Sequence, residues 1–143
     1  MMKRIFLLVM LALSAGCWGE PHWGEPHNML SQVNIHASHE VQVKVIDAIK
    51  QFGKRNGFKV DASNNLPREG RQVMQVLLTR PDGVMVVTDN FMNADVLDTG
   101  FYAEKPGEGW REVKEKWLAE MRTVVGNQGN VVDVILEKEP ATK

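Results

Sequence analysis

Hydrophobic residues recur at helical spacing in two stretches of the chain. In residues 39–56 they lie on one helical stripe, at Val41, Val45, Ile49 and Phe52. In residues 108–125 they do so again, at Trp110, Val113, Trp117, Met121 and Val124. The pattern predicts two amphipathic helices, each with one face turned to a core.

The residues that flank these stretches are typical of helix ends. Ser38 precedes the first stretch and is a favoured N-cap, while Gly57 follows it at the position where a left-handed residue often ends a helix. Gly126 follows the second stretch in the same way. A strand over residues 41–45 is the competing interpretation, but Ile49 and Phe52 continue the helical spacing and favour the helix.

Four other stretches are predicted to be strands: residues 31–37, 71–79, 84–91 and 130–138. The first and last alternate apolar residues on one face, at Val33, Ile35 and Ala37 and at Val132, Val134 and Leu136. The two middle stretches flank Arg80–Gly83, whose Pro and Gly suit a type I turn. The middle pair is therefore predicted to form a β-hairpin.

The remaining stretches carry weaker patterns. Residues 58–62 are compatible with an extended segment, and Ser63–Gly70 has the composition of a loop. Val96–Ala103 is compatible with one further short strand, which Lys105–Gly107 would end.

The order strand, helix, strand, strand, helix, strand predicts an α+β fold of the split βαβ, ferredoxin-like kind, written βαββαβ. We expect a four-stranded antiparallel sheet with both helices on one face. Residues 31–138 would form this single domain, and residues 139–143 would fray. Such a fold hosts many functions, so it predicts none by itself.

The first sixteen residues have the plan of a secretory signal peptide. Lys3 and Arg4 form a basic segment, and Ile5–Leu13 is an uninterrupted apolar run, too short to cross a membrane as a helix. Ser14–Gly16 are all small, and Cys17 follows. An ordinary signal peptide, with Cys17 incidental, remains the alternative interpretation.

The segment Leu13–Cys17 resembles the lipobox of bacterial lipoproteins, with Ser14 at the place where Leu is commonest. The resemblance covers residues 1–17 only. It implies cleavage before Cys17 and attachment of lipid to the Cys17 thiol, and two or three acyl chains hold a protein on a membrane essentially permanently. Trp18 replaces the Asp that commonly retains such proteins in the inner membrane, so the resemblance implies the periplasmic side of the outer membrane.

Residues 17–30 are predicted to be a tether between lipid and domain. The sequence WGEPH occurs twice, at Trp18–His22 and Trp23–His27, and its Gly and Pro oppose regular structure. All four histidines of the chain lie close together in the sequence: His22, His27, His36 and His39. Imidazole suits zinc, copper or nickel, so metal capture is an alternative, although the spacing fits no established ligand pattern.

Charge and cysteine content narrow the possible partners. The first sixteen residues hold two basic side chains and no acidic one, so the rest of the chain has 15 basic against 18 acidic side chains. This balance gives no general attraction to nucleic acid. Cys17 is the only cysteine, which excludes a framework of disulfides within the chain and an iron–sulfur cluster held by several thiolates.

Several residues are of types that could carry chemistry. An oxygen-rich run follows the hairpin and consists of Asp89, Asn90, Asn93, Asp95 and Asp98. Calcium takes oxygen ligands, so this run is a candidate calcium site. A solvated loop is the simpler interpretation. Trp110 and Trp117 are expected in the core, and Phe101 and Tyr102 are expected to pack rather than to form a recognition loop. We predict no catalytic residue, cofactor or metal site.

The sequence therefore favours a lipid-anchored envelope protein whose domain binds another macromolecule or serves the envelope without catalysis. Its expected partners are the membrane, through the acylated Cys17, and an envelope protein. A metal-binding lipoprotein that uses the histidine-rich tether is one alternative. An inhibitor or immunity protein of the envelope is another.

Overall fold

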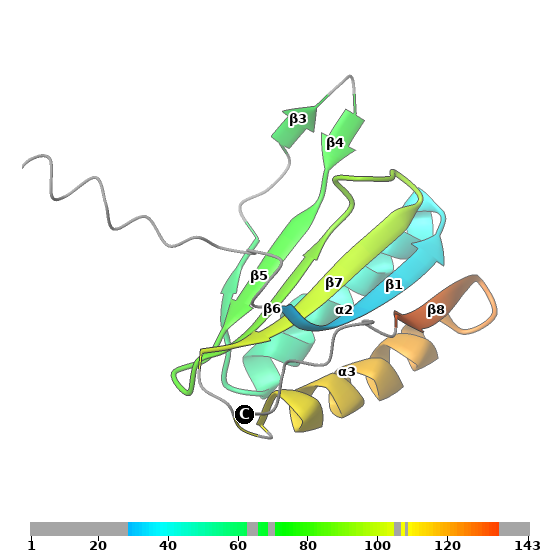
Figure 1. Cartoon of the computed structure of the whole chain (residues 1–143). Helices are drawn as coiled ribbons and strands as arrows, with labels where there is room; N and C mark the ends of the chain where they lie inside the picture. Colours follow the sequence, from blue (N-terminus) through cyan, green and yellow to red (C-terminus); the bar gives the residue numbers. More distant parts are fainter. Residues whose placement is uncertain (1–28, 63–65, 69–70, 105–106, 108, 135–143) are drawn as a thin grey trace, which may run out of the picture.

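A computed structural model describes residues 29–62, 66–68, 71–104, 107 and 109–134. Within these residues two helices cover one face of a six-stranded antiparallel sheet, and a two-stranded ribbon projects beyond the end of that sheet (Figure 1). The predicted signal peptide, Cys17, residues 17–28 of the tether, residues 135–138 of the last strand and the tail at 139–143 lie outside the described residues.

The elements follow one another in an α+β order. They are β1 (Met29–Ala37), α2 (His39–Arg55), β2 (Lys59–Asp61), β3 (Leu66–Arg68), β4 (Arg71–Val73), β5 (Gln75–Thr79), β6 (Val84–Asp89), β7 (Val96–Ala103), α3 (Gly109–Val125) and β8 (Gly129–Val134). The large sheet has the order β2-β5-β6-β7-β1-β8, and the ribbon pairs β3 with β4.

The first helix confirms the prediction for residues 39–56, except that it ends at Arg55. The Ser38 hydroxyl accepts a hydrogen bond from the Val41 backbone N–H at 3.4 Å, and Gly57 adopts φ 78° after the last turn. Its apolar stripe is buried against the sheet: Val41, Val45, Ile46, Ile49 and Phe52. The capping residues and the burial of one face therefore both favour a helix over the same residues.

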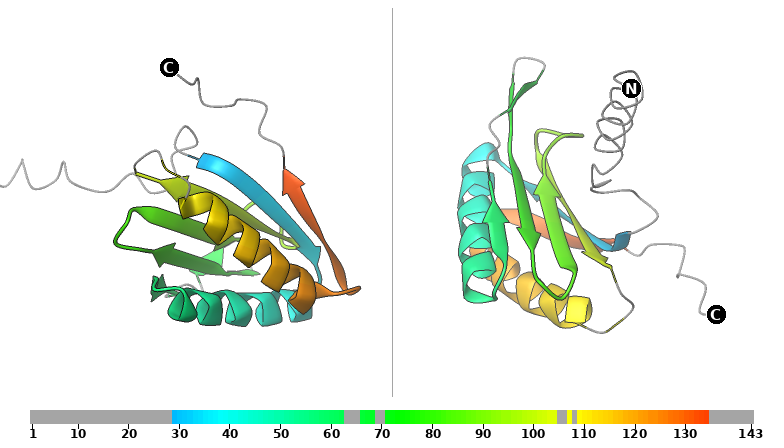
Figure 2. Two further views of the ribbon diagram at one scale, coloured as in Figure 1. Left: turned by 90° about the horizontal axis from the view of Figure 1, so that it is seen from below. Right: turned by 90° about the vertical axis from the view of Figure 1, so that its left-hand side faces the viewer.

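The second helix begins at Gly109 and ends at Val125, and Gly126 follows it with φ 54°. The helix crosses the same face of the sheet as α2, as Figure 2 shows from below. Trp117 is fully buried, and its ring meets the ring of Phe101 from β7 edge to face at 5.5 Å between centroids. This contact fastens α3 to the middle of the sheet.

The predicted hairpin is confirmed. β5 pairs antiparallel with β6, and the Gly83 backbone N–H donates to the Arg80 carbonyl at 3.0 Å across the turn. Gly83 adopts φ 87°, a conformation that suits glycine. The Arg80 guanidinium also donates to both carboxylate oxygens of Asp82, which closes the turn further.

Two predictions about this region were wrong. The strand expected over residues 71–79 is interrupted at Met74, where the chain passes from the ribbon strand β4 to the sheet strand β5. The Met74 backbone exchanges hydrogen bonds with Asn90, which holds this crossing point. Residues 66–68, expected in a loop, form strand β3, because β4 supplies its backbone partners.

The expected count of four strands was also wrong, because the large sheet has six. The weakly predicted segment 96–103 is β7, which pairs with β6 on one side and β1 on the other. Residues 58–62 contain β2, which pairs with β5 at the edge. In the sequence, the apolar pattern of β7 is interrupted by Asp98, Thr99 and Gly100, although this strand lies inside the sheet.

The last strand places its apolar residues differently from the first. Val131 packs against the core on the helix side, whereas Val132 alternates to the opposite face and is 37% exposed. Asp133 returns to the helix side, where its carboxylate pairs with the Lys114 ammonium of α3 at 2.8 Å. The residues predicted to share one face of this strand, Val132 and Val134, therefore lie on the helix-free face.

Candidate functional site

The helix-free face of the sheet carries a row of polar side chains across neighbouring strands. Asn34 of β1 is paired with Asp98 of β7, Asp98 with Asp89 of β6, and Asp89 with Gln75 of β5. Residues paired across antiparallel strands point to the same face. Two carboxylates therefore lie directly opposite each other on adjacent strands, in the middle of an open face.

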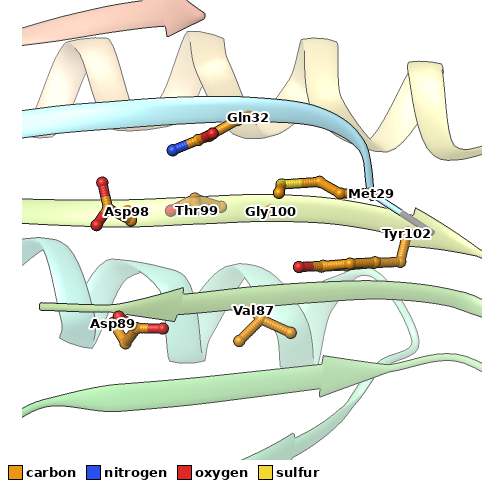
Figure 3. Close-up of a pocket in the computed structure, with 8 residues that line it drawn as sticks. All are labelled: Met29, Gln32, Val87, Asp89, Asp98, Thr99, Gly100 and Tyr102. Atoms are coloured by element: carbon orange, nitrogen blue, oxygen red, sulfur yellow. The ribbon is translucent and has the colours of Figure 1, made fainter. Parts of the chain in front are cut away.

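Gly100 leaves a gap beside these carboxylates, and the ring of Tyr102 lies over it. A Cβ atom on Gly100 would come within 2.7 Å of the Tyr102 ring and 2.8 Å of its hydroxyl oxygen. The ring thus lies along β7 and its hydroxyl is directed back toward Gly100 (Figure 3). Glycine at this position is what allows the aromatic side chain to lie flat on the sheet.

Together these side chains surround a shallow cavity of about 100 Å³ (Figure 3). It is lined by Met29, Gln32, Val87, Asp89, Asp98, Thr99, Gly100 and Tyr102. The apolar part of the lining comes from Met29 and Val87, and the polar part from two carboxylates, one amide and one phenol. The pairing of β1 with β7 is irregular between Met29 and Ser31, next to the point where Met29 reaches the cavity.

The two carboxylates are unfavourably placed as charges. Burial raises the pKa of the Asp89 carboxyl, a hydrogen bond from the Phe91 backbone N–H opposes this rise, and the negative charge of Asp98 adds to it. Burial also raises the pKa of Asp98, while the nearby His36 lowers it. The ionised form of each carboxyl group is therefore less stable here than in water.

The Tyr102 hydroxyl belongs to the same electrostatic site. Tyr102 is 8% exposed, and burial followed by the charge of Asp89 raises the pKa of its hydroxyl. Within the described part of the chain this hydroxyl makes no hydrogen bond. Gln32 donates its amide N–H to Asn34 at 3.0 Å, which orients its side chain at the cavity rim. The site offers oxygen acceptors and no positive charge in its lining.

The predicted site residues fall in different places. Cys17, His22 and His27 lie outside the described residues. His36 ends up on β1, on the helix-free face, and His39 is exposed at the start of α2. Among the described residues no three His, Cys, Asp or Glu side chains gather closely enough to hold a metal ion.

The oxygen-rich run separates into a structural part and a part that belongs to the cavity. Asn90 is buried, where its amide accepts from the Met74 backbone N–H at 2.9 Å and donates to Gln42 at 3.2 Å. Asn93 accepts from the backbone N–H of Asp95 in an exposed turn, as expected of a solvated loop. Asp89 and Asp98 are brought together on the sheet instead.

The aromatic residues pack, as predicted. Phe101 is buried beneath α3 and Tyr102 is buried on the other face, so neither forms an exposed loop. Trp117 is in the core and Trp110 is partly buried against it. Gln32 was missed as a site residue, and the alternation of polar residues along residues 32–36 is the signal that would have placed it on the open face.

Comparisons with known proteins add no relative: no protein-family model matches the chain, and no similar curated protein is found. Among the described residues there is no helix that is both long enough and apolar enough to cross a membrane. The site is therefore interpreted from its own geometry.

Proposed function

We propose that this chain is a lipid-anchored protein of the bacterial envelope whose domain binds a macromolecular partner, without catalysis, through the helix-free face of the sheet. The observation that carries the binding role is the Asp89–Asp98 pair, two like charges held opposite each other beside a cavity. Like charges in this position destabilise a sheet. Their placement is accounted for if a partner supplies the missing positive charge.

The anchoring role rests on the sequence of residues 1–17. Lys3 and Arg4, the apolar run and the small residues before Cys17 support export and lipid attachment. The tether at residues 17–30 would then hold the domain near the membrane, on the periplasmic side of the outer membrane. In this arrangement the acyl chains supply location and the sheet supplies recognition.

The ferredoxin-like arrangement is proposed as the inner part of the fold. Support comes from the neighbouring strands β8, β1, β7 and β6, which follow in that order, with α2 leaving β1 and α3 joining β7 to β8. In this interpretation β2 and β5 extend the β6 side of a four-stranded unit. Hydrogen exchange slower in β1 and β7 than in β2 supports the assignment, and the reverse order contradicts it.

The anchor is tested by labelling with palmitate. The parent should incorporate the label and stay with membranes in high salt, because acyl burial is not screened by ions. The Cys17→Ser variant should lose the label. Label that persists in Cys17→Ser overturns the anchoring role.

The binding face is tested with a photo-crosslinking amino acid at one of two matched valines. Val132 is 37% exposed on the helix-free face, and Val43 is 42% exposed on α2. In intact cells, the probe at position 132 should yield a discrete crosslinked product that the probe at position 43 does not. Equal products from both positions, or none from position 132, contradict binding through this face.

A further inference from the structure

The cavity on the helix-free face is smaller than a typical small-molecule pocket. Ligand pockets for small molecules are typically about 300–1,000 Å³, whereas this cavity has about 100 Å³. A space of this size accommodates the end of one side chain. Because the cavity lies on an open sheet face, a side chain projecting from a partner surface can reach it.

The polar groups around the cavity select a cation. Asp89 and Asp98 provide two carboxylates, and Tyr102, a residue only 8% exposed, directs its hydroxyl toward Gly100 on the same face. This hydroxyl makes no hydrogen bond with another described residue. No Lys or Arg side chain lines the cavity. The lining therefore has acceptors for several N–H donors and no cation, while His36 of β1, outside the lining, acts electrostatically on Asp98.

The spacing and the apolar lining favour a guanidinium. Side chains directly opposite on antiparallel strands have Cβ atoms about 4.5–5.5 Å apart, so the two carboxylates can engage different edges of one planar group. A guanidinium presents five N–H donors in a fixed fork, whereas an ammonium is a compact point charge. Met29 and Val87 provide apolar surface for the methylenes of an arginine stem.

We propose that this cavity receives an arginine side chain of a partner protein, held by Asp89 and Asp98 with the Tyr102 hydroxyl and the Gln32 amide beside it. This proposal rests on the proposed function, since it names the group by which the partner is recognised. The guanidinium neutralises the opposed carboxylates and gives the phenol oxygen a donor. A bidentate charge-assisted contact of this kind fixes orientation as well as affinity.

The test uses the full-length lipidated protein in detergent micelles and three probes: the peptide acetyl-Gly-Arg-Gly-amide, its citrulline counterpart and agmatine. Citrulline keeps the shape of arginine but is neutral. We expect the arginine peptide to bind saturably, as followed by the NMR signals of the Tyr102 ring, and the citrulline peptide to bind at least tenfold more weakly. Equal binding of the two peptides overturns the proposal.

Variants locate the binding. Asp89→Asn and Asp98→Asn should each weaken binding of the arginine peptide at least tenfold. Asp47→Asn, which changes an exposed carboxylate on α2, should leave this binding unchanged. Both cavity variants keep the size of the side chain, and melting curves confirm that each is folded. Binding that survives both cavity variants, or that Asp47→Asn weakens equally, overturns the site.

Two further outcomes separate other ligands from a protein arginine. Agmatine binding tenfold more tightly than the peptide would assign the site to a small free guanidine instead of a protein side chain. Magnesium chloride displacing the peptide at equal concentration would assign the site to a metal. Either result overturns the proposal. If the crosslink from position 132 persists in Asp89→Asn and Asp98→Asn, the arginine contact is wrong but the binding face stands. If position 132 gives no crosslink while the arginine peptide binds, the proposed function fails instead.

Discussion

At the scale of single residues, the helix-free face contains an arrangement that lowers stability. Asp89 and Asp98 are paired across β6 and β7, and both are partly withdrawn from water. Opposed like charges cost about 0.2–1 kcal/mol. On the other side of β7, at Thr99, the same pair of strands makes a favourable contact, a buried hydroxyl pair between Thr88 and Thr99 at 2.8 Å. The helix side of these two strands thus contributes a favourable contact where the helix-free side contributes a repulsive one.

Asp89→Asn is therefore expected to stabilise the domain at pH 7. The pKa of Asp89 is raised in the folded protein above the ordinary value of 3.8, so the folded state binds a proton more tightly than the unfolded state. Its stability accordingly falls as pH rises from about 3.8 through the folded pKa, and this loss persists at pH 7. Asparagine removes the charge and can still accept the Phe91 hydrogen bond.

Thermal unfolding at pH 7 and pH 3 measures this effect. We expect a gain of up to about 1 kcal/mol at pH 7, or roughly 4–8 °C for each kcal/mol in a small domain, and a much smaller gain at pH 3. Asp47→Asn serves as the exposed control. A lower melting temperature for Asp89→Asn at pH 7 would show that the carboxylate is compensated in the folded protein.

Trp117 is expected to be the residue on which α3 depends most. Its side chain is fully buried against Phe101, and truncation of a buried Trp to Ala costs about 3–5 kcal/mol. Trp117→Ala should unfold the domain or lower its denaturation midpoint severely. Lys116→Ala, which removes only an exposed pair with Glu112, should change it little. Equal midpoints for Trp117→Ala and the parent would contradict this packing.

At the scale of elements, a buried amide joins the start of α2 to the loop that leads into β7. The Gln42 side chain is fully buried and donates to the carbonyls of Ala37 at 3.0 Å and Ala94 at 2.8 Å. Its oxygen accepts from Asn90. One side chain thus ties together the end of β1, the helix and the connection between β6 and β7.

Gln42→Leu should therefore destabilise the domain although it makes the helix more apolar. The substitution removes the Gln42 partner from the buried Asn90 amide and from the partly buried carbonyls of Ala37 and Ala94. An unsatisfied buried polar group costs about 1–3 kcal/mol. Gln51→Leu, at an exposed position of the same helix, is the control. Chemical denaturation of both variants decides the matter; equal midpoints would mean that the buried hydrogen bonds contribute nothing measurable.

At the scale of the whole molecule, the described elements from β1 onward share one hydrophobic core. The core residues lie between Val33 and Val125, and both helices pack on one face of a sheet whose first strand begins at Met29. The domain and the anchor are expected to be separable.

A chain that begins at Asn28 behind an ordinary cleavable signal is accordingly expected to be soluble in the periplasm and to unfold in one cooperative transition. Fractionation and thermal melting measure this, with the full-length protein, which is expected to fractionate with membranes, as the comparison. Insoluble protein, or a melt without cooperativity, would show that the tether or the membrane completes the fold.

The sequence by itself determined the elements whose signals are local. Helical periodicity with Ser38 and Gly57 at the ends located α2, and the turn at Arg80–Gly83 located the β5–β6 hairpin, because the residues that decide these features are neighbours in the chain. The proposed lipid attachment at Cys17 is likewise a prediction from a short contiguous segment.

Only the tertiary structure decided the place of β7 inside the sheet, the six-strand count and the opposition of Asp89 and Asp98. The local pattern of β7 is broken by polar residues and glycine, and what makes it a strand is the supply of backbone partners from β1 and β6. Likewise, two aspartates nine positions apart form a site only because the register of two strands puts them opposite each other. Pairing register is a property of strand assembly, and no single segment encodes it.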